Sequence, residues 1–326
     1  MTKPRGKILV IRGGAIGDFI LTLPVFSALR QQFPQTRLEV LAYPHIAQLA
    51  FVGGLVDEVR PIESRALAGF FAGHGSLDSN LAEYFNSFSI IISYLYDPDR
   101  IFHENVARVS KAQFIVGPHR PDETRQRHAV DVFLQPLERL AIFDADRIPR
   151  LSVPDLSFEV LPSGNWLALH PGSGSERKNW PERNWAELLK HLIESTDFKV
   201  LLVGGEAEGE RLDRLAAALP PHRIKVAQHL PLADLAQWLK HAGGFVGHDS
   251  GISHLAAAIG LPGLILWGET NESIWRPPAP QISLLRAPRS LAELDVPFVI
   301  EQLNGWLVGD RRKVPATNPF CENEIH

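Results

Sequence analysis

The feature that most constrains this chain is the alternation of short apolar runs with longer amphipathic stretches. The apolar runs are rich in Val, Ile and Leu and have the length of strands that are buried on both faces. We predict such strands at Lys7–Arg12, Leu38–Ala42, Ser89–Tyr94, Ala112–Val116, Trp166–His170, Lys199–Val203, Gly244–Val246 and Gly263–Trp267. Helical spacing lies between them at Asp18–Phe33, Asn184–Glu194, Glu208–Leu219, Leu232–His241 and Gly251–Ile259. The alternation predicts an α/β fold, in which helices cover both faces of parallel sheets.

Other segments divide or interrupt this pattern. The chain has 326 residues, enough for two domains, and Arg150–Asn165 is rich in Pro and Ser, as is typical of an interdomain linker. We therefore predict an N-terminal domain at residues 1–155, a C-terminal domain at 156–310 and a polar tail at 311–326.

Two local departures are expected in the first half. Pro24 lies inside the first helical stretch and is expected to kink or interrupt that helix. The polar segment Ala66–Glu83 is expected to form a mobile loop with a short helix.

Composition excludes several function classes. Hydrophobic residues make up 45% of the chain and charged residues 21%, the balance of a soluble globular enzyme. The formal net charge of −4 disfavours a dedicated nucleic-acid binder, which needs a basic excess. The single cysteine, Cys321, can form neither an internal disulfide nor a Cys-rich zinc site. Because no run of about 18 apolar residues occurs, we expect a cytoplasmic protein without a membrane span.

The first candidate site directly follows the first predicted strand, in the sequence GGAIGD. Glycines such as Gly14 and Gly17 let the backbone approach a ligand, and the N–H groups at a helix start favour an anion. The spacing differs from G-x-G-x-x-G, so a dinucleotide site is not the natural interpretation. Asp18 is either a capping carboxylate or a general base at the mouth of a cleft.

The second candidate is the loop HPGSGS, which follows the strand at Trp166–His170. Its backbone N–H groups and the hydroxyls of Ser173 and Ser175 can bind phosphate oxygens, with Lys178 as the counter-charge. An ordinary Gly/Ser connection beside a solvated lysine is the alternative interpretation.

The third candidate is the turn GHDSGISH, again between a strand and a helix. Asp249 or Ser250 can cap that helix, and the N–H groups at Ser250 and Gly251 can bind a pyrophosphate. His254 lies one helical turn beyond Ser250, where a histidine is either structural or part of the anion site.

The fourth candidate is the turn GGEAEGE, where a carboxylate can accept hydrogen bonds from ribose hydroxyls. Glu206, Glu208 and Glu210 all compete for that role with the alternative of solvated first-turn acids. All four candidates lie at the carboxyl ends of predicted strands, and three belong to the second half. The sequence therefore predicts a nucleotide-activated donor on the second half and a base on the first.

Three of these segments resemble a known family. ILVIRGGAIGDFILTLPVFSALRQQFP, HPGSGSERKNWPERNWAEL with its K-x-W-P element, and FVGHDSGISHLAAAIGLPGLILWG with its D-[ST]-G-x-x-H signature are similar to motifs of glycosyltransferase family 9. This family comprises the heptosyltransferases of lipopolysaccharide core assembly. The resemblance covers Lys7–Pro61 and Trp166–Pro277, and D-[ST]-G-x-x-H is its most specific part.

The resemblance implies a GT-B fold, with two Rossmann-like domains whose parallel sheets face each other across a cleft. It also implies transfer of a heptose with inversion from an ADP-heptose donor to an acidic lipid-linked saccharide, without an obligatory metal or cofactor. Such an enzyme is expected in the cytoplasm, at the inner face of the bacterial inner membrane.

The resemblance also assigns roles to individual residues. Asp18 matches the catalytic base of the family, and Glu208 falls at its ribose-binding acid. The residues that match its donor-binding segments, or that lie in the first turn beside them, are Gly14, Gly17, Ser173, Ser175, Lys178, Asp249, Ser250, Gly251 and His254.

The chain departs from the family pattern at the last turn and in the acceptor region. Glu269 stands where the family's final Gly-Pro-Thr turn has proline, since this chain reads WGET. An acidic acceptor can be bound by arginines of the first half, for which we predict Arg60, Arg65, Arg120 and Arg125, with Arg127 as a further candidate. The charge-rich stretch HRPDETRQRH that holds three of them is also typical of a solvated loop.

Three other functions remain open from the sequence. Asp97-Pro98-Asp99 and Asp144-Ala145-Asp146 fit the D-x-D pattern of metal-dependent GT-A glycosyltransferases, and insensitivity of transfer to EDTA would exclude that class. A non-catalytic protein that binds nucleotide sugars would fit the weak match of the acceptor half, although the presence of Asp18 argues against it. A sugar-nucleotide epimerase on the same fold would need further acids in the cleft.

Overall fold

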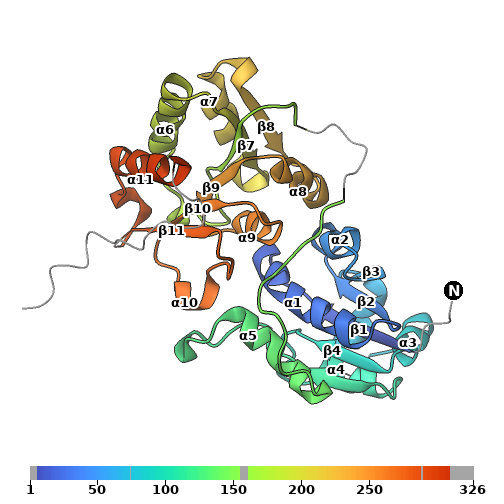
Figure 1. Cartoon of the computed structure of the whole chain (residues 1–326). Coiled ribbons are helices and arrows are strands. Elements are labelled where there is room, and N and C mark those ends of the chain that lie inside the picture. The colour runs from blue at the N-terminus through green and yellow to red at the C-terminus, as the bar shows by residue number, and fades with distance from the viewer. Residues whose placement is uncertain (1–5, 74, 155–160, 288, 309–326) are drawn as a thin grey trace, which may run out of the picture. The chain divides into compact units, whose positions relative to one another are not determined.

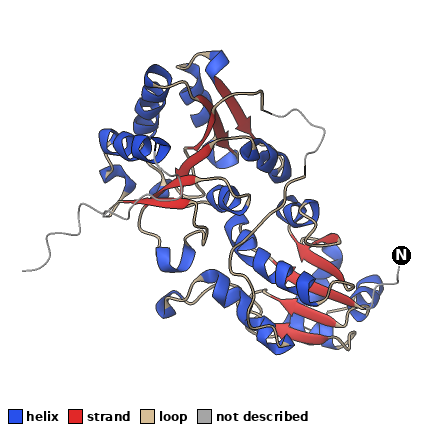
Figure 2. Cartoon of the chain, viewed as in Figure 1, coloured by secondary structure: helices blue, strands red, loops and turns tan. Residues whose placement is uncertain are grey.

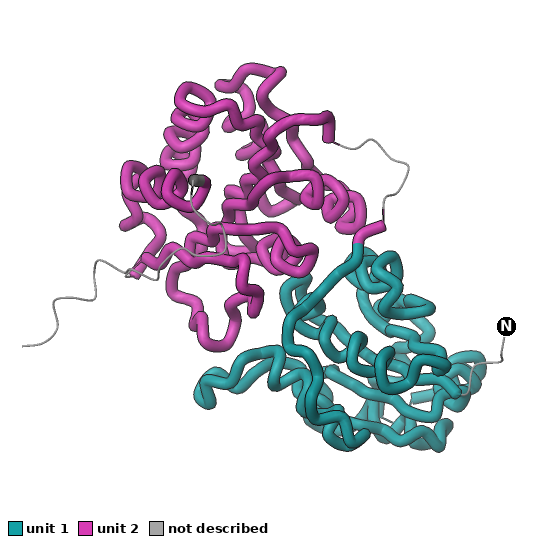
Figure 3. Tube along the Cα trace, viewed as in Figure 1, with its two compact units in different colours: residues 1–152 teal, residues 153–326 magenta. Residues whose placement is uncertain are grey.

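The computed structural model describes residues 6–308 except 74, 155–160 and 288. The chain forms two compact units, which divide between Ser152 and Val153 inside the Pro- and Ser-rich segment 150–165 (Figure 3). We call them unit 1 (residues 1–152) and unit 2 (residues 153–326). The predicted polar tail at 311–326, with Cys321, lies outside the described residues.

Unit 1 is built on a parallel sheet with the strand order β3-β2-β1-β4-β5 (Figure 1). The strands are β1 Lys7–Arg12, β2 Arg37–Ala42, β3 Glu58–Pro61, β4 Ile90–Ser93 and β5 Gln113–Val116. In the register of the sheet, Ile8 of β1 is opposite both Leu38 and Ile90. The chain moves outward from β1 in one direction through β2 and β3, and in the other through β4 and β5. The strand order therefore reverses beside β1, which is where open α/β sheets bind ligands.

Helices cover both faces of this sheet, as the alternation predicts (Figure 2). The helices are α1 Ile16–Gln32, α2 Pro44–Val52, α3 Ser79–Asn86, α4 Ile101–Ala107 and α5 Ala129–Leu134, with 3-10 turns η1 Arg65–Phe71, η2 Glu123–Arg125 and η3 Gln135–Leu140. Helix α1 packs against α2 and α5. An aromatic-rich core joins η1, α3 and α4 to the face of β1 that carries Leu9 and Ile11.

One of the two local predictions for unit 1 needs correction. Helix α1 continues through Pro24 to Gln32, so the proline does not interrupt it. The helix is buried at nearly every position from Phe19 to Leu29, and this packing outweighs the hydrogen bond that proline removes. The segment 66–83, for which a short helix was expected, contains most of the 3-10 helix η1 and the start of α3, and Leu67 and Phe70 of η1 pack into the core.

Unit 2 carries a second parallel sheet, with the order β11-β10-β9-β6-β7-β8. Its strands are β6 Trp166–His170, β7 Lys199–Gly204, β8 Ile224–Gln228, β9 Gly244–His248, β10 Gly263–Trp267 and β11 Ile282–Arg286. Its helices are α6 Glu182–Ser195, α7 Arg211–Ala217, α8 Leu232–Lys240, α9 Gly251–Ala258, α10 Glu272–Trp275 and α11 Val296–Val308, with 3-10 turns η4 Glu176–Lys178, η5 Glu206–Glu208, η6 Pro221–Arg223 and η7 Leu291–Glu293. The strand order reverses between β6 and β9.

The main core of unit 2 lies on one face of its sheet. Helix α6 buries Trp185, Leu188, Leu189 and Leu192, the three-and-four spacing of one helix face. These side chains join apolar residues of α7 and α11 against the central strands. Among the helices of the described ranges, not one has both the length and the apolar character that a membrane span requires.

Candidate active site

The donor-binding candidates of unit 2 follow three strands that lie side by side. The loop after β6 contains Ser173 and Lys178, the turn after β7 contains Glu208, and the turn after β9 contains Asp249. Strand β6 pairs with both β7 and β9, so the three connections emerge next to one another at the carboxyl edge of the sheet. The predicted donor residues thus gather at the reversal of strand order.

The loop after β6, which we call the phosphate loop (residues 171–180), is stabilised by its own serine. The Ser173 hydroxyl donates to the carbonyl of Ser175 at 2.8 Å and accepts from the N–H of Ser175 at 3.2 Å. Ser173 is buried, Ser175 is half-buried and Gly174 is exposed. Ser173 therefore shapes the loop, while residues 176–178 after it are exposed.

Lys178 connects the phosphate loop to the turn after β9. Its Nζ lies 2.7 Å from Oδ2 of Asp249. The Lys178 side chain is 44% exposed and that of Asp249 only 10%, so the cation remains accessible to a ligand while its partner is held in place. Such an ion pair with an exposed lysine adds little stability by itself. Lys178 can therefore replace the Asp249 carboxylate with an anionic group of a ligand.

Ser250, rather than Asp249, is the N-cap of α9. Its hydroxyl accepts from the N–H of Ser253 at 3.3 Å, as a capping serine does. Gly251 is the first residue of the helix, and His254 is buried one turn further on. The partial positive charge of this helix start favours an anion beside Ser250.

Glu208 is the buried acid among the three glutamates that follow β7. Glu206 and Glu210 are exposed, whereas Glu208 lies in the 3-10 turn η5 and accepts from the N–H of Gly205 at 2.5 Å. Burial raises the pKa of Glu208, but hydrogen bonds from His170 and Gly205 outweigh it, and the pKa lies below its ordinary value. The helix predicted from Glu208 instead begins at Arg211, because Gly209 breaks the segment with a positive φ.

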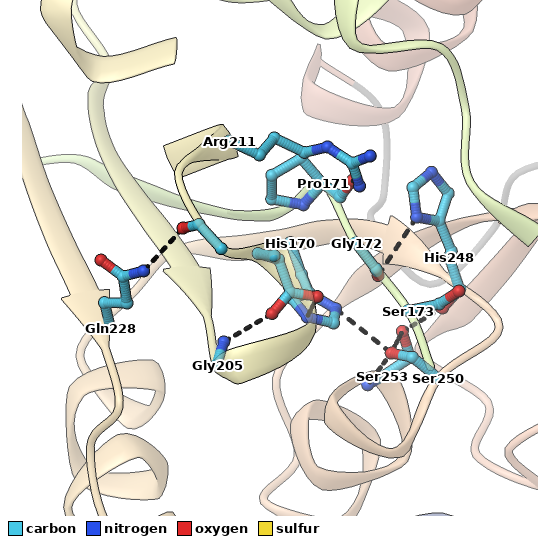
Figure 4. Close-up of polar contacts among 12 residues, drawn as sticks. His170, Pro171, Gly172, Ser173, Gly205, Arg211, Gln228, His248, Ser250 and Ser253 are labelled. Carbon is cyan, nitrogen blue, oxygen red and sulfur yellow. Dashed lines mark hydrogen bonds and ion pairs between the residues drawn. The ribbon is translucent and has the colours of Figure 1, made fainter. Parts of the chain in front are cut away.

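His170 connects Glu208 to the cap of α9, and Figure 4 shows its contact with Ser250. Its Nε2 lies 3.6 Å from Oε1 of Glu208, and its Nδ1 lies 3.2 Å from the hydroxyl of Ser250. His170 is itself buried as the last residue of β6. The turn after β7 and the helix start after β9 are therefore joined through one imidazole ring.

In unit 1, Asp18 lies in the first turn of α1, after the glycines that follow β1. Its Oδ2 accepts from the N–H of Ala15 at 3.2 Å, so the capping interpretation is correct for this oxygen. Gly14 has a φ of +103°, and a Cβ there would lie 3.1 Å from the same oxygen. Gly17 is part of α1, and the Asp18 side chain is 26% exposed, which leaves the carboxylate accessible to a substrate.

Arg12 is a buried cation beside Asp18. Its Nη2 lies 3.6 Å from Oδ1 of Asp18, and its Nη1 donates to the carbonyl of His119 at 2.9 Å. The guanidinium also lies 4.3 Å from the ring centre of Phe133. Burial lowers the pKa of Arg12, an effect that the charge of Asp18 opposes. Arg12 therefore links the candidate base to the segment that precedes Arg120.

The arginines predicted for the acceptor lie in or after strands of unit 1. Arg60 lies on β3 with its Nε 2.8 Å from Glu58, and Arg65 is the exposed first residue of η1. In the connection after β5, Arg120 is paired with Glu123 at 2.8 Å, Arg125 with Asp122 at 3.2 Å, and Arg127 donates to Gln135 at 3.4 Å. Because β1, β3 and β5 are parallel, the segments that come after β3 and β5 leave the sheet at the same edge as the turn that precedes Asp18.

Three buried titratable residues that lie beside the candidates were not predicted from the sequence. Arg12, His170 and His248 are the last residues of β1, β6 and β9, the strands beside which the order of each sheet reverses. Each is at most 4% exposed. A titratable residue that ends an otherwise apolar strand is a pattern that could have identified them.

One carboxylate of each D-x-D segment is used in local structure. Asp97 accepts from the N–H groups of Phe102 and His103 at the start of α4, and Asp146 pairs with Arg150. Within the described residues, no three His, Cys, Asp or Glu side chains come together as a metal site would require.

Comparison with known proteins identifies the family. The model of glycosyltransferase family 9 (heptosyltransferase) matches residues 119–296, more than half of the chain. The chain belongs to glycosyltransferase family 9. Family 9 membership makes it a glycosyltransferase and agrees with the resemblance that the three sequence motifs carry.

Relatives of this family 9 chain match it over most of its length. A lipopolysaccharide heptosyltransferase 1 of Escherichia coli strain RS218 is 30% identical over 86% of this chain and 94% of its own. The solved ADP-heptose LPS heptosyltransferase II of E. coli has a TM-score of 0.74 and 20% identity, over 92% of this chain and 98% of its own. The E. coli heptosyltransferase WaaC, solved with ADP, has a TM-score of 0.68 and 19% identity, over 91% and 99%. These structural likenesses establish the GT-B fold, which excludes the metal-dependent GT-A class.

Proposed function

We propose that this chain transfers a heptose from ADP-heptose to an acidic saccharide of the lipopolysaccharide-core type, with inversion at the anomeric carbon. The observation that carries the proposal is the Lys178–Asp249 contact of 2.7 Å. In this family 9 chain, the Lys178–Asp249 contact brings the phosphate loop to the start of α9, where the strand order reverses between β6 and β9. The WaaC relative that was solved with ADP supports adenosine diphosphate as the nucleotide.

On the donor side, Lys178 exchanges Asp249 for an oxygen of the diphosphate. The N–H groups at Ser250 and Gly251 supply further positive potential. As the bond between the anomeric carbon and the diphosphate breaks, negative charge grows on the leaving ADP, and these groups stabilise it. We propose Ser173, Ser175 and His254 as further donor contacts and Glu208 as the ribose ligand, with Gly14 and Gly17 allowing close approach in unit 1.

On the acceptor side, Asp18 is the general base. Its carboxylate removes the proton from an acceptor hydroxyl while that oxygen attacks the anomeric carbon from the face opposite the departing ADP. Arg12, 3.6 Å away, orients this carboxylate. Arg60, Arg65 and Arg120, with Arg125, bind the acidic groups of the acceptor. The reaction proceeds without a metal, and transfer is expected to persist in EDTA.

The first experiment is calorimetric titration with ADP, UDP and GDP without added metal. Selective binding of ADP is expected, and Lys178→Ala should weaken it by about tenfold because a charge-assisted contact to phosphate is lost. Arg177→Ala is the matched control, since Arg177 is the exposed neighbour in the same 3-10 turn. Preference for UDP or GDP would overturn the proposed donor.

The second experiment tests the base. Asp18→Asn keeps the side-chain shape and is expected to abolish transfer from ADP-heptose while leaving ADP affinity unchanged. Asp144→Asn is the control, because Asp144 is exposed elsewhere in unit 1. Retained transfer in Asp18→Asn would disprove the assignment, and binding without transfer in the unaltered chain would favour a non-catalytic protein.

A further inference from the structure

His248 contacts both ends of the phosphate loop. Its Nε2 accepts a hydrogen bond from the N–H of Trp180 at 2.9 Å, and its Nδ1 lies 3.2 Å from the carbonyl oxygen of Gly172. Gly172 precedes Ser173, and Trp180 follows Lys178, so the two contacts bracket the proposed phosphate ligands. His248 has no exposed surface. Figure 4 shows its ring directed toward Gly172.

Only one protonation state of His248 satisfies both contacts. A backbone N–H can only donate, so Nε2 must be unprotonated to accept from Trp180. A backbone carbonyl can only accept, so Nδ1 must carry the proton that it donates to Gly172. The ring is therefore neutral, in the Nδ1–H tautomer.

The surroundings keep this ring neutral. Burial lowers the pKa of His248 to about 3, and the opposing effect of the Gly172 carbonyl is too small to restore it. Of the charged and titratable groups around the ring, His170 on β6 and Arg211 on α7 lower its pKa further, while Glu208 raises it. Trp185 of α6 packs edge-on against the ring, with 5.3 Å between ring centres.

The phosphate loop has a second support outside this ring. Arg211 donates to the carbonyl of Pro171 at 3.4 Å and to the Glu176 carboxylate at 2.9 Å. Besides the Ser173 contacts and the 3-10 turn η4, the loop contains Gly172 and Gly174 and belongs to no strand, so its conformation also depends on such outside contacts. A loop that is held in its binding conformation loses less entropy when it binds a ligand.

We infer that His248 is a positioning residue of the donor site: it fixes both ends of the phosphate loop and thereby places Ser173, Ser175 and Lys178 against the donor diphosphate. The inference rests on the proposed function for the identity of the ligand. We call the pair of His248 contacts, with Gly172 and with Trp180, the clamp. Both contacts exist without a ligand.

Three substitutions separate the two contacts. His248→Phe keeps a ring but removes both hydrogen bonds. The amide nitrogen of His248→Asn can replace Nδ1 toward Gly172, and the amide oxygen of His248→Gln can replace Nε2 toward Trp180. His222→Phe is the matched control, because His222 is an exposed histidine of the same unit.

The first measurements need no donor. Nitrogen NMR of the unaltered chain is expected to show His248 protonated at Nδ1 only. Trypsin cleaves after Arg177 and Lys178, and cleavage there is expected to be faster by about tenfold or more in His248→Phe. Cleavage in His248→Asn and His248→Gln should be intermediate in rate, and cleavage in His222→Phe should be as slow as in the unaltered chain. An Nε2-protonated ring, or cleavage as slow in His248→Phe as in the unaltered chain, would overturn the clamp.

The second measurements use ADP and the transfer reaction. His248→Phe is expected to raise the Kd for ADP and the donor KM by about tenfold, with the acceptor KM unchanged. Simple loss of folded protein would lower the apparent kcat and leave both KM values alone. If His248→Phe does not fold, the Asn and Gln variants carry the test, and affinity in both equal to the unaltered chain refutes the inference. Failure of the unaltered chain to bind ADP would refute the proposed function instead, while the cleavage and NMR results still decide the clamp.

Discussion

Lowering the pH from about 7 to about 5 is expected to destabilise unit 2 through His248. In the folded unit, burial holds the pKa of this histidine at about 3, against an ordinary value of 6.5. The unfolded chain therefore binds a proton below pH 6.5 that the folded unit excludes. The stabilising contribution is fully present above pH 6.5 and is lost as the pH falls toward 3.

The size of the effect follows from the two pKa values. Each pH unit below the unfolded pKa costs about 1.4 kcal/mol of unfolding free energy, so the step to pH 5 costs about 2 kcal/mol. Carboxylates contribute little in this interval. The pKa values of Glu208 and Glu182 lie below their ordinary 4.5, so their contributions are lost only at lower pH.

The assay is urea unfolding followed by tryptophan fluorescence. All seven tryptophans of the chain lie in residues 166–306, so the signal reports on unit 2 alone. The quantity to compare is the change in unfolding free energy between the two pH values, in the unaltered chain and in His248→Gln, which cannot titrate. The unaltered chain should lose about 2 kcal/mol more than the variant. Equal losses in the two proteins would show that the buried neutral imidazole does not control the acid sensitivity of this unit.

Two further substitutions test the packing around the phosphate loop of unit 2 and around Asp18 of unit 1. Gly172→Ala should destabilise unit 2 by about 1–3 kcal/mol, because the new Cβ would lie 2.0 Å from Oε1 of Glu208. Gly174→Ala is the control, since a Cβ there meets nothing within 4 Å, and equal urea midpoints for the two variants would contradict the prediction. Arg12→Met should destabilise unit 1 by about 1–3 kcal/mol, because the His119 carbonyl loses its buried donor, and should strongly lower transfer without changing ADP affinity. Circular dichroism measures the stability and calorimetry the ADP affinity, and Arg139→Met is the control because Arg139 is exposed. Transfer at the unaltered rate in Arg12→Met would refute the role of Arg12 beside Asp18.

The central strands of both sheets, and the turns that follow them, could be predicted from the amino-acid pattern alone. β1, β6 and β10 coincide with predicted apolar runs, because a strand buried on both faces must be apolar along its whole length. The strands that were not predicted, β3, β8 and β11, are all edge strands of their sheets. Edge strands are partly exposed and therefore need no continuous apolar run, so composition does not distinguish them from loops.

The motifs also predicted which turns would carry the candidate residues, since glycines, a capping serine and a lysine have recognisable local roles. Only the tertiary structure determined the choice among alternatives. Ser250 caps α9 because its backbone is extended there, and Glu208 is the buried glutamate because the turn after β7 directs it toward His170.

The partners of the buried charged and titratable residues likewise become known from the folded structure. Arg12 bonds to His119, and His248 to Gly172 and Trp180, across separations of 68 to 107 residues. Local sequence patterns report which segments are apolar, helical or capped, because those properties depend on neighbours in the chain. The partner of a buried polar group depends instead on which strands lie side by side in the sheet, and sheet order is a property of the whole fold.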